Sequence, residues 1–381
     1  DVDGFLVGSA SLKPEFSDIV RSCHGKSGAF GPFMVDWVAY PLLLLALGAF
    51  SAVPVHPYAQ MLVLATGTVY VGCHRSLGQI ALSPGEAQQE SVSRSDALQF
   101  PVMGSAMLFG LYIVVKFVSK EYLNLLLAAY FLVIGATAVV ATLRTPLQKL
   151  PAWRRLRTHV FRFRYQLWLA NPPEERVEWV VADVPLAALG LAVSVAYAYT
   201  KSWVLSNVLG ICFSVSAIEL ISLSSFQVGC ILLMALFVYD VFWVFGTEVM
   251  VTVAKGIDAP IKLLFPKNIG ADKLEFSMLG LGDIVIPGIF VALMLRFDAR
   301  QALPGLPYFR ANLAGYASGL VATVAVMHFF EAAQPALLYL VPACLGSAVA
   351  VALARGEMAT LWAFSEDESP PGDKGEAKKD K

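Results

Sequence analysis

Long apolar runs separated by short polar stretches dominate the chain. Ten runs are long enough to cross the hydrocarbon core of a bilayer, which takes about 20 residues of helix. They lie near residues 35–53, 58–77, 99–118, 122–143, 180–200, 203–223, 228–250, 279–297, 308–330 and 335–354. None shows the ten-residue alternation of membrane β-strands, and a helix satisfies its own backbone hydrogen bonds without water. The pattern predicts an all-α, polytopic membrane helix bundle.

Composition agrees with this prediction. Of the 381 residues, 57% are hydrophobic and 15% are charged, and the net charge is −1. Soluble proteins average roughly 45–50% apolar and about 25% charged residues. These values exclude a disordered chain, a disulfide scaffold and a nucleic-acid binder that relies on net positive charge. The five cysteines show no short metal-type spacing, and we predict neither a metal site nor a cofactor.

Positive charge is concentrated in the loop between the runs 122–143 and 180–200. This loop holds eight basic residues: Arg144, Lys149, Arg154, Arg155, Arg157, Arg162, Arg164 and Arg176. A short loop so rich in Lys and Arg is typical of the cytoplasmic side of a membrane. Alternating the later loops from this point places the C-terminus in the cytoplasm. The side of the N-terminus depends on whether the run 35–53 crosses the membrane or lies at its surface.

Two carboxylates lie inside apolar runs. Asp240 is in the middle of GCILLMALFVYDVFWVFG, and Asp283 is near the start of MLGLGDIVIPGIFVALML. An ionised Asp near the bilayer centre costs ~2.5–3.5 kcal/mol on insertion scales, so a charge in this position is a functional hypothesis by default. These two residues are therefore the first candidates for chemistry.

Two classes of protein use paired membrane carboxylates. If two carboxyls lie within hydrogen-bonding distance they share a proton, as in the pepsin dyad, and can activate water and polarise a peptide carbonyl. Proton-coupled transporters also use Asp relays at the membrane midplane. A third interpretation, structural ion pairs, requires intramembrane Lys or Arg partners. The Asp pair alone leaves protease and transporter open.

Three short motifs decide between these classes. They are Tyr239-Asp240, Gly280-Leu281-Gly282-Asp283 and Pro335-Ala336-Leu337, in this order. Together they resemble the YD, GxGD and PAL motifs of the intramembrane aspartyl proteases, the family of presenilins and signal peptide peptidases. The segments APIKLLFP and QPALLYLVPACLG are more similar to the signal peptide peptidase branch. The resemblance covers roughly residues 58–355 and favours a protease over a transporter.

The resemblance implies a detailed set of properties. It implies nine transmembrane helices, a catalytic pair formed by Asp240 and Asp283 on the sixth and seventh, and no cofactor. It assigns the substrate-lining motif to Pro335, Ala336 and Leu337. The residues beside the two Asp are further candidates for substrate contact: Gly280, Leu281 and Gly282, where glycine lets backbone approach the substrate closely, and Tyr239, which is expected to pack or hydrogen-bond beside the carboxylates. The expected substrates are remnant signal peptides and membrane segments whose N-terminus faces the cytosol, in the endoplasmic reticulum. The family further suggests homo-oligomers and a link to the machinery that removes misfolded membrane proteins.

The chain then divides into five parts. Residues 1–33 form an N-terminal extramembrane segment and 34–57 an additional hydrophobic segment, neither with a counterpart in the family pattern. Residues 58–200 hold transmembrane helices 1–4, and 201–355 hold the catalytic helices 5–9. Residues 356–381 form a cytoplasmic tail whose charge, Pro and Gly content predicts disorder.

Two further hypotheses concern the loop and the tail. The loop 255–275 carries Pro260 and Pro266 and is a candidate to hold extended substrate by strand addition. Near the end of the tail, Lys378 and Lys379 resemble a di-lysine retrieval signal of endoplasmic reticulum membrane proteins.

Overall fold

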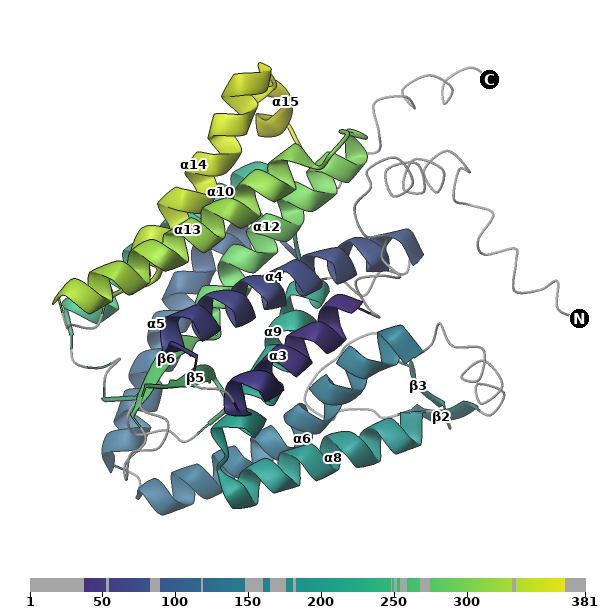
Figure 1. Cartoon of the computed structure of the whole chain (residues 1–381), viewed down its shortest axis with the longest axis vertical. Coiled ribbons are helices and arrows are strands. Elements are labelled where there is room, and N and C mark those ends of the chain that lie inside the picture. The colour runs from purple at the N-terminus through teal and green to yellow at the C-terminus, as the bar shows by residue number, and fades with distance from the viewer. Residues whose placement is uncertain are drawn as a thin grey trace, which may run out of the picture.

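The structure is a computed structural model and describes most of the chain between residues 38 and 366. The described residues are 38–52, 55–82, 90–117, 119–147, 160–164, 176–180, 183–247, 249, 252–253, 259–267, 275–330 and 334–366. Within this part, the chain forms a helix bundle with three short two-stranded sheets (Figure 1).

The helices coincide with the apolar runs. They are α3 (Tyr40–Ala52), α4 (Pro57–Leu82), α5 (Arg94–Phe117), α6 (Lys120–Leu147), α8 (Asp183–Thr200), α9 (Trp203–Leu220), α10 (Phe226–Phe245), α12 (Gly282–Arg300), α13 (Pro307–Phe330), α14 (Leu337–Arg355) and the short α15 (Met358–Trp362). The strands are β1 (Glu90–Val92), β2 (Val160–Arg164), β3 (Arg176–Val180), β4 (Ile221–Leu223), β5 (Lys262–Pro266) and β6 (Phe276–Gly280). The prediction of an all-α membrane bundle is confirmed.

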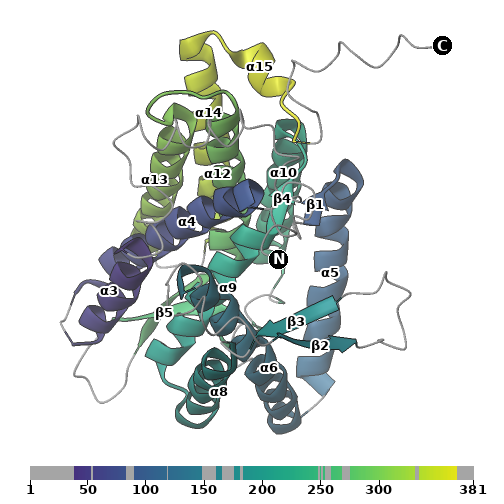
Figure 2. The same cartoon turned by 90° about the vertical axis from the view of Figure 1, so that its right-hand side faces the viewer.

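Seven of the described helices are long and apolar enough to cross a membrane: α5, α6, α8, α9, α10, α13 and α14. Helices α4 and α12 carry more polar residues, including Arg75 in α4 and Arg296 and Asp298 in α12. Helix α12 is buried continuously over residues 287–299. Helix α4 crosses in front of it in Figure 2 and packs on α3, α9, α12 and α13. A helix enclosed by protein needs no apolar face toward lipid. The expected count of nine transmembrane helices is therefore not confirmed.

Small residues set the spacing of the central helices. A Cβ added to Gly288 of α12 would lie 2.6 Å from Ile218 of α9, and one added to Gly229 of α10 would lie 2.9 Å from the ring of Phe290. Small residues let membrane helices approach closely. These contacts hold α9 and α10, which flank strand β4, directly against α12.

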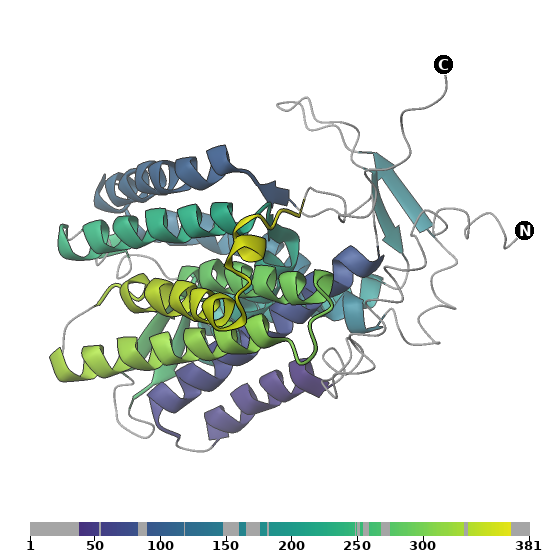
Figure 3. The same ribbon diagram turned by 90° about the horizontal axis from the view of Figure 1, so that it is seen from above.

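The outer helices form pairs around this centre. Helices α13 and α14 run side by side, and α5 lies along α10 (Figure 3). Helices α6 and α8 form a third pair (Figures 1 and 2). Many large apolar side chains on the outer helices are exposed, among them Met107 on α5 and Leu126 on α6. In water such a surface would be costly, whereas contact with lipid tails makes it favourable.

The additional N-terminal segment forms a short helix. Helix α3 has 13 residues, or about 20 Å at 1.5 Å per residue, which is shorter than the roughly 30 Å hydrocarbon core. It packs on α4 and α9 through the buried Tyr40, Leu43 and Leu47. Residues 1–33 lie outside the described residues.

The region before Asp283 differs from the prediction. We expected a loop over 255–275 and a helix from residue 279, but β5 and β6 pair as antiparallel strands and α12 begins at Gly282. The other sheets are β1 with β4, in parallel, and β2 with β3, antiparallel. By hydropathy, the apolar residues of such a short strand cannot be told from the first residues of the apolar helix that follows, which explains why the start of the helix was predicted too early.

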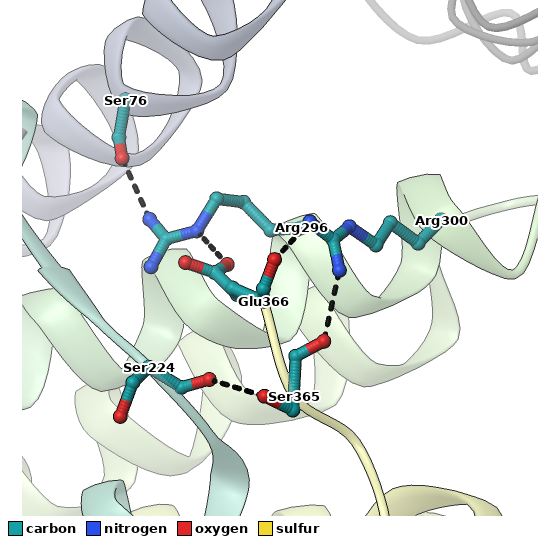
Figure 4. Close-up of polar contacts among 6 residues, drawn as sticks. All are labelled: Ser76, Ser224, Arg296, Arg300, Ser365 and Glu366. Carbon is teal, nitrogen blue, oxygen red and sulfur yellow. Dashed lines mark hydrogen bonds and ion pairs between the residues drawn. The ribbon is translucent and has the colours of Figure 1, made fainter. Parts of the chain in front are cut away.

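The predicted disorder of the tail is wrong for its first residues. Leu361 and Phe364 are buried against the bundle, and Phe364 meets the ring of Phe297 at 5.0 Å. Ser365 forms a β-bridge with Ser225. The hydroxyl of Ser365 also donates to the carbonyl of Ser224, and Glu366 pairs with the buried Arg296 (Figure 4). These apolar and ionic contacts order the chain as far as residue 366. The remaining tail, with Lys378 and Lys379, lies outside the described residues.

Candidate active site

Asp240 lies near the C-terminal end of α10, with its side chain buried. Ser225 caps the start of the helix, and its side chain accepts a hydrogen bond from the backbone N–H of Val228. At the other end, the backbone N–H of Leu337 donates to Oδ2 of Asp240 over 3.0 Å. Leu337 is the first residue of α14, where backbone N–H groups have no partner within the helix. Asp240 therefore acts as the acceptor that caps α14 from a neighbouring helix.

Asp283 lies in the first turn of α12 and is half-buried. Strand β6 leads directly into this turn, and a Cβ added to Gly280 would lie 3.3 Å from Oδ2 of Asp283. The two carboxylates, Asp240 and Asp283, are close enough to interact electrostatically. A carboxylate in the first turn of a helix is also favoured by the helix dipole.

The sequence-predicted residues of the PAL motif meet this pair. Pro335, Ala336 and Leu337 are all buried, and the N–H groups of Tyr339 and Leu340 both donate to the carbonyl of Ala336, over 3.1 Å each. The motif thus forms the corner at which the chain enters α14. This corner brings backbone, rather than a polar side chain, to Asp240.

The residues between the strands and α12 are joined to the β5–β6 pair. Leu281 donates its N–H to the carbonyl of Ile261 over 3.1 Å, and its own carbonyl accepts from Val285 and Ile284. Gly282 is exposed, and a Cβ there would have only an ordinary contact, 3.9 Å from Ile286. The GxGD motif is therefore the junction between a strand and a helix.

Tyr239 lies at the contact between α10 and α5. Its ring is 3.6 Å from the position of a Cβ on Gly104, and it neighbours Trp243, whose indole N–H donates to Ser105 over 3.1 Å. The sequence predicts Tyr239 beside the carboxylates. Its ring packs against α5, and the residue interacts electrostatically with Asp240.

Tyr316 of α13 is a site residue that the sequence analysis missed. Its side chain is fully buried, its hydroxyl has no hydrogen-bond partner among the described residues, and it interacts electrostatically with Asp283. No pattern in the sequence distinguishes it from an ordinary tyrosine in an apolar helix. Only the packing of α13 on α12 reveals its position.

Arg296 lies on the same helix as Asp283 but far from it. Thirteen residues of helix separate them, or about 20 Å. Its guanidinium donates to Glu366 and, over 2.7 Å, to Ser76. The described residues also contain no group of three metal-ligating side chains. Within the described part of the chain, the two neighbouring carboxylates form no ion pair with a basic side chain, which suits acid–base chemistry on water and a peptide carbonyl.

The profile of the signal peptide peptidase family matches residues 85–368. The chain belongs to this family. It is 43% identical to Signal peptide peptidase of Mus musculus over 322 residues, which is 83% of this chain and 84% of the mouse protein. The human protein is 42% identical with the same coverage. A probable intramembrane protease of Schizosaccharomyces pombe is 34% identical over 81% of this chain and 95% of its own length.

Membership confirms the resemblance drawn from the three motifs. Signal peptide peptidases are intramembrane aspartic proteases, so this chain is a multi-pass membrane hydrolase that acts on transmembrane peptides. The transporter interpretation has no support.

Proposed function

We propose that Asp240 and Asp283 form the catalytic dyad and hydrolyse one peptide bond within a transmembrane helix. The observation that carries this proposal is that neighbouring helices bring two carboxylates together, one of them held by the N–H of Leu337. Close carboxyls share a proton. The ionised one takes a proton from water while the water oxygen bonds to the carbonyl carbon, and the protonated one donates to the carbonyl oxygen. Collapse of this diol, with proton transfer to nitrogen, releases the amine.

The substrates we propose are remnant signal peptides and segments whose N-terminus faces the cytosol. A helix hides its carbonyls in backbone hydrogen bonds, so the scissile segment must unwind before attack. Residues that weaken a helix, such as Gly or Ser, are therefore expected near the cleaved bond. Gly280, Leu281, Gly282, Pro335, Ala336 and Leu337 line its path, with Tyr239 on the side of α5.

Strand β6 supports an extended binding mode for the unwound substrate. The hydrogen bonds from Leu281 to Ile261 and from Lys267 to Glu275 fix which pairs of the β5–β6 ladder are hydrogen-bonded. Because an antiparallel ladder alternates, Met278 directs its N–H and C=O away from β5. Neither group has a partner among the described residues, and the Met278 side chain is 48% exposed. A substrate strand added here would run toward Gly280 and Asp283.

A cleavage assay on a synthetic signal peptide in proteoliposomes tests the dyad. Asp240→Asn and Asp283→Asn keep the side-chain shape and are each expected to abolish cleavage. Asp96→Asn, at the exposed start of α5, is the matched control and should cleave like wild type. Residual wild-type cleavage in either dyad variant would refute the assignment. Proton or solute movement without any cleavage would instead favour the transporter.

We place the enzyme in the endoplasmic reticulum membrane with its C-terminus in the cytoplasm. The end of the bundle where α15 packs also carries Arg75, Arg296 and Arg300. Helix α5 starts at this end and α6 runs back toward it, so the arginine-rich segment that follows α6 begins there too. By the positive-inside rule, this concentration of charge supports a cytoplasmic side for this end. Lys378 and Lys379 are then available for retrieval. Homo-oligomers and membrane-protein degradation machinery are the proposed partners.

A further inference from the structure

Asn207 of α9 makes an unusual contact with strand β5. The residue is fully buried. Its Nδ2 donates to the carbonyl of Leu264 over 2.8 Å, and its Oδ1 accepts from the N–H of Leu264 over 2.7 Å. One side-chain amide thus satisfies both main-chain groups of one strand residue, as a residue of a neighbouring strand would.

The contact lies on the outer edge of β5. In the alternating ladder, Leu264 is opposite Met278 in a pair without mutual hydrogen bonds, so both residues direct their main-chain groups outward. At Leu264 these groups are taken by Asn207, and the next outward position is Pro266, which has no N–H. The outward main-chain groups of Leu264 on the β5 edge are therefore occupied, whereas those of Met278 on the β6 edge have no partner among the described residues.

Helix α9 also sets the position of the strand pair. One turn after Asn207, Gly210 faces the same strand, and a Cβ there would lie 2.9 Å from Leu263 and 3.3 Å from Leu281. Leu281 belongs to the GxGD motif. The amide of Asn207 and the small surface of Gly210 together hold β5 and the start of α12 against α9.

We propose that Asn207 is a positioning residue that closes the outer edge of β5, so that an unwound substrate pairs only with β6, beside Asp283. This inference rests on the proposed strand addition and names the residue that selects the edge. Unpaired strand edges accept any extended peptide. With both edges open, substrate would bind in two ways, only one of which passes the dyad in the productive register.

The test compares the products of wild type, Asn207→Leu, Leu264→Pro and the double variant, each as the full chain in proteoliposomes. Asn207→Leu keeps the side-chain size and removes both hydrogen bonds, which leaves the main-chain N–H and C=O of Leu264 without this partner. Leu264→Pro removes the outward N–H, and proline is tolerated at a sheet edge. Mass spectrometry of the fragments gives the cleavage position, and labelling by a transition-state-analogue aspartyl inhibitor reports whether the dyad is formed.

We expect Asn207→Leu to retain inhibitor labelling, to cleave at the main position about tenfold more slowly and to give additional cleavage positions. Leu264→Pro should keep the wild-type positions. The double variant should regain a single main position, because proline closes the edge without the amide. The inference would be overturned by wild-type products from Asn207→Leu, or by a double variant no better than Asn207→Leu. Joint loss of labelling and cleavage in both Asn207→Leu and Asn207→Ser would also overturn it.

Asn207→Ser distinguishes a folding failure of Asn207→Leu from the loss of the contact with Leu264. It leaves a smaller polar side chain that is too short to reach Leu264. It should show the same additional positions, and a single wild-type position would count against the edge-closing role. The parent proposal fails separately: it fails if wild type does not cleave, or if Asp240→Asn does. The inference on Asn207 fails separately when wild type cleaves and Asp240→Asn does not, but the Asn207 variants keep the wild-type cleavage position.

Discussion

Two tyrosines of α13 show how one residue type serves two purposes in this bundle. Tyr308 and Tyr316 are both fully buried. The hydroxyl of Tyr308 donates to Glu357 over 3.0 Å, while that of Tyr316 has no partner among the described residues and lies near Asp283. A buried hydroxyl without a protein partner is costly, so its retention near a carboxylate suggests a role with water or substrate.

Replacing each tyrosine by phenylalanine separates these roles. Tyr316→Phe removes no protein hydrogen bond, so we expect unchanged unfolding and a several-fold lower kcat. Tyr308→Phe loses its bond to Glu357 and should lower the free energy of unfolding by about 1 kcal/mol, with unchanged kcat. Cleavage kinetics and denaturant titration in the same detergent measure both. Equal effects of the two variants on kcat would contradict a role of Tyr316 in the reaction.

At this scale the sequence predicts the residues that carry a motif and misses those that act through packing. Asp240 and Asp283 stand out because a charge in an apolar run is exceptional. Asn207 and Tyr316 are also polar groups in apolar runs, but such residues are common and their partners are distant in the chain. Nothing in the spacing links Asn207 to Leu264, 57 positions later.

At the scale of elements, hydropathy located the helices and missed the strands. The β5–β6 pair is only five residues a side, and its apolar residues merge with the apolar start of α12. The close approach of helices is equally invisible in hydropathy, because glycine serves in loops, turns and contacts alike. The structure identifies Gly190 as such a contact: a Cβ there would lie 2.6 Å from the carbonyl oxygen of Ala136.

Gly190→Ala therefore tests the packing of α8 against α6. The added methyl meets backbone, which cannot rotate away, so we expect a loss of about 1–3 kcal/mol of unfolding free energy. Gly48→Ala in α3 is the control, because a Cβ there has no atom within 4 Å and alanine favours a helix by roughly 0.5–1 kcal/mol. Thermal unfolding in detergent compares them. Equal midpoints for the two variants would contradict the close contact.

At the scale of the whole molecule, the C-terminal segment ties together helices far apart in the chain. Glu366 pairs with Arg296 of α12, which also donates to Ser76 of α4, and Arg300 donates to the carbonyls of Ser365 and Glu366 (Figure 4). The N–H of Glu366 donates to Ser224, just before α10. The segment thus joins the ends of the two helices that carry Asp240 and Asp283, at the opposite end from the dyad.

Glu366→Gln measures how much the C-terminal segment contributes to the stability of the bundle. The guanidinium of Arg296 is almost fully buried and Glu366 is largely so; removing one charge of a buried pair costs about 3–5 kcal/mol. We expect a strong loss of thermal stability and, because α10 and α12 loosen together, a lower kcat. Glu357→Gln is the matched control, since its pair with Arg355 is partly exposed and such pairs contribute little. If both variants unfold at the wild-type temperature, the C-terminal segment does not hold the catalytic helices together.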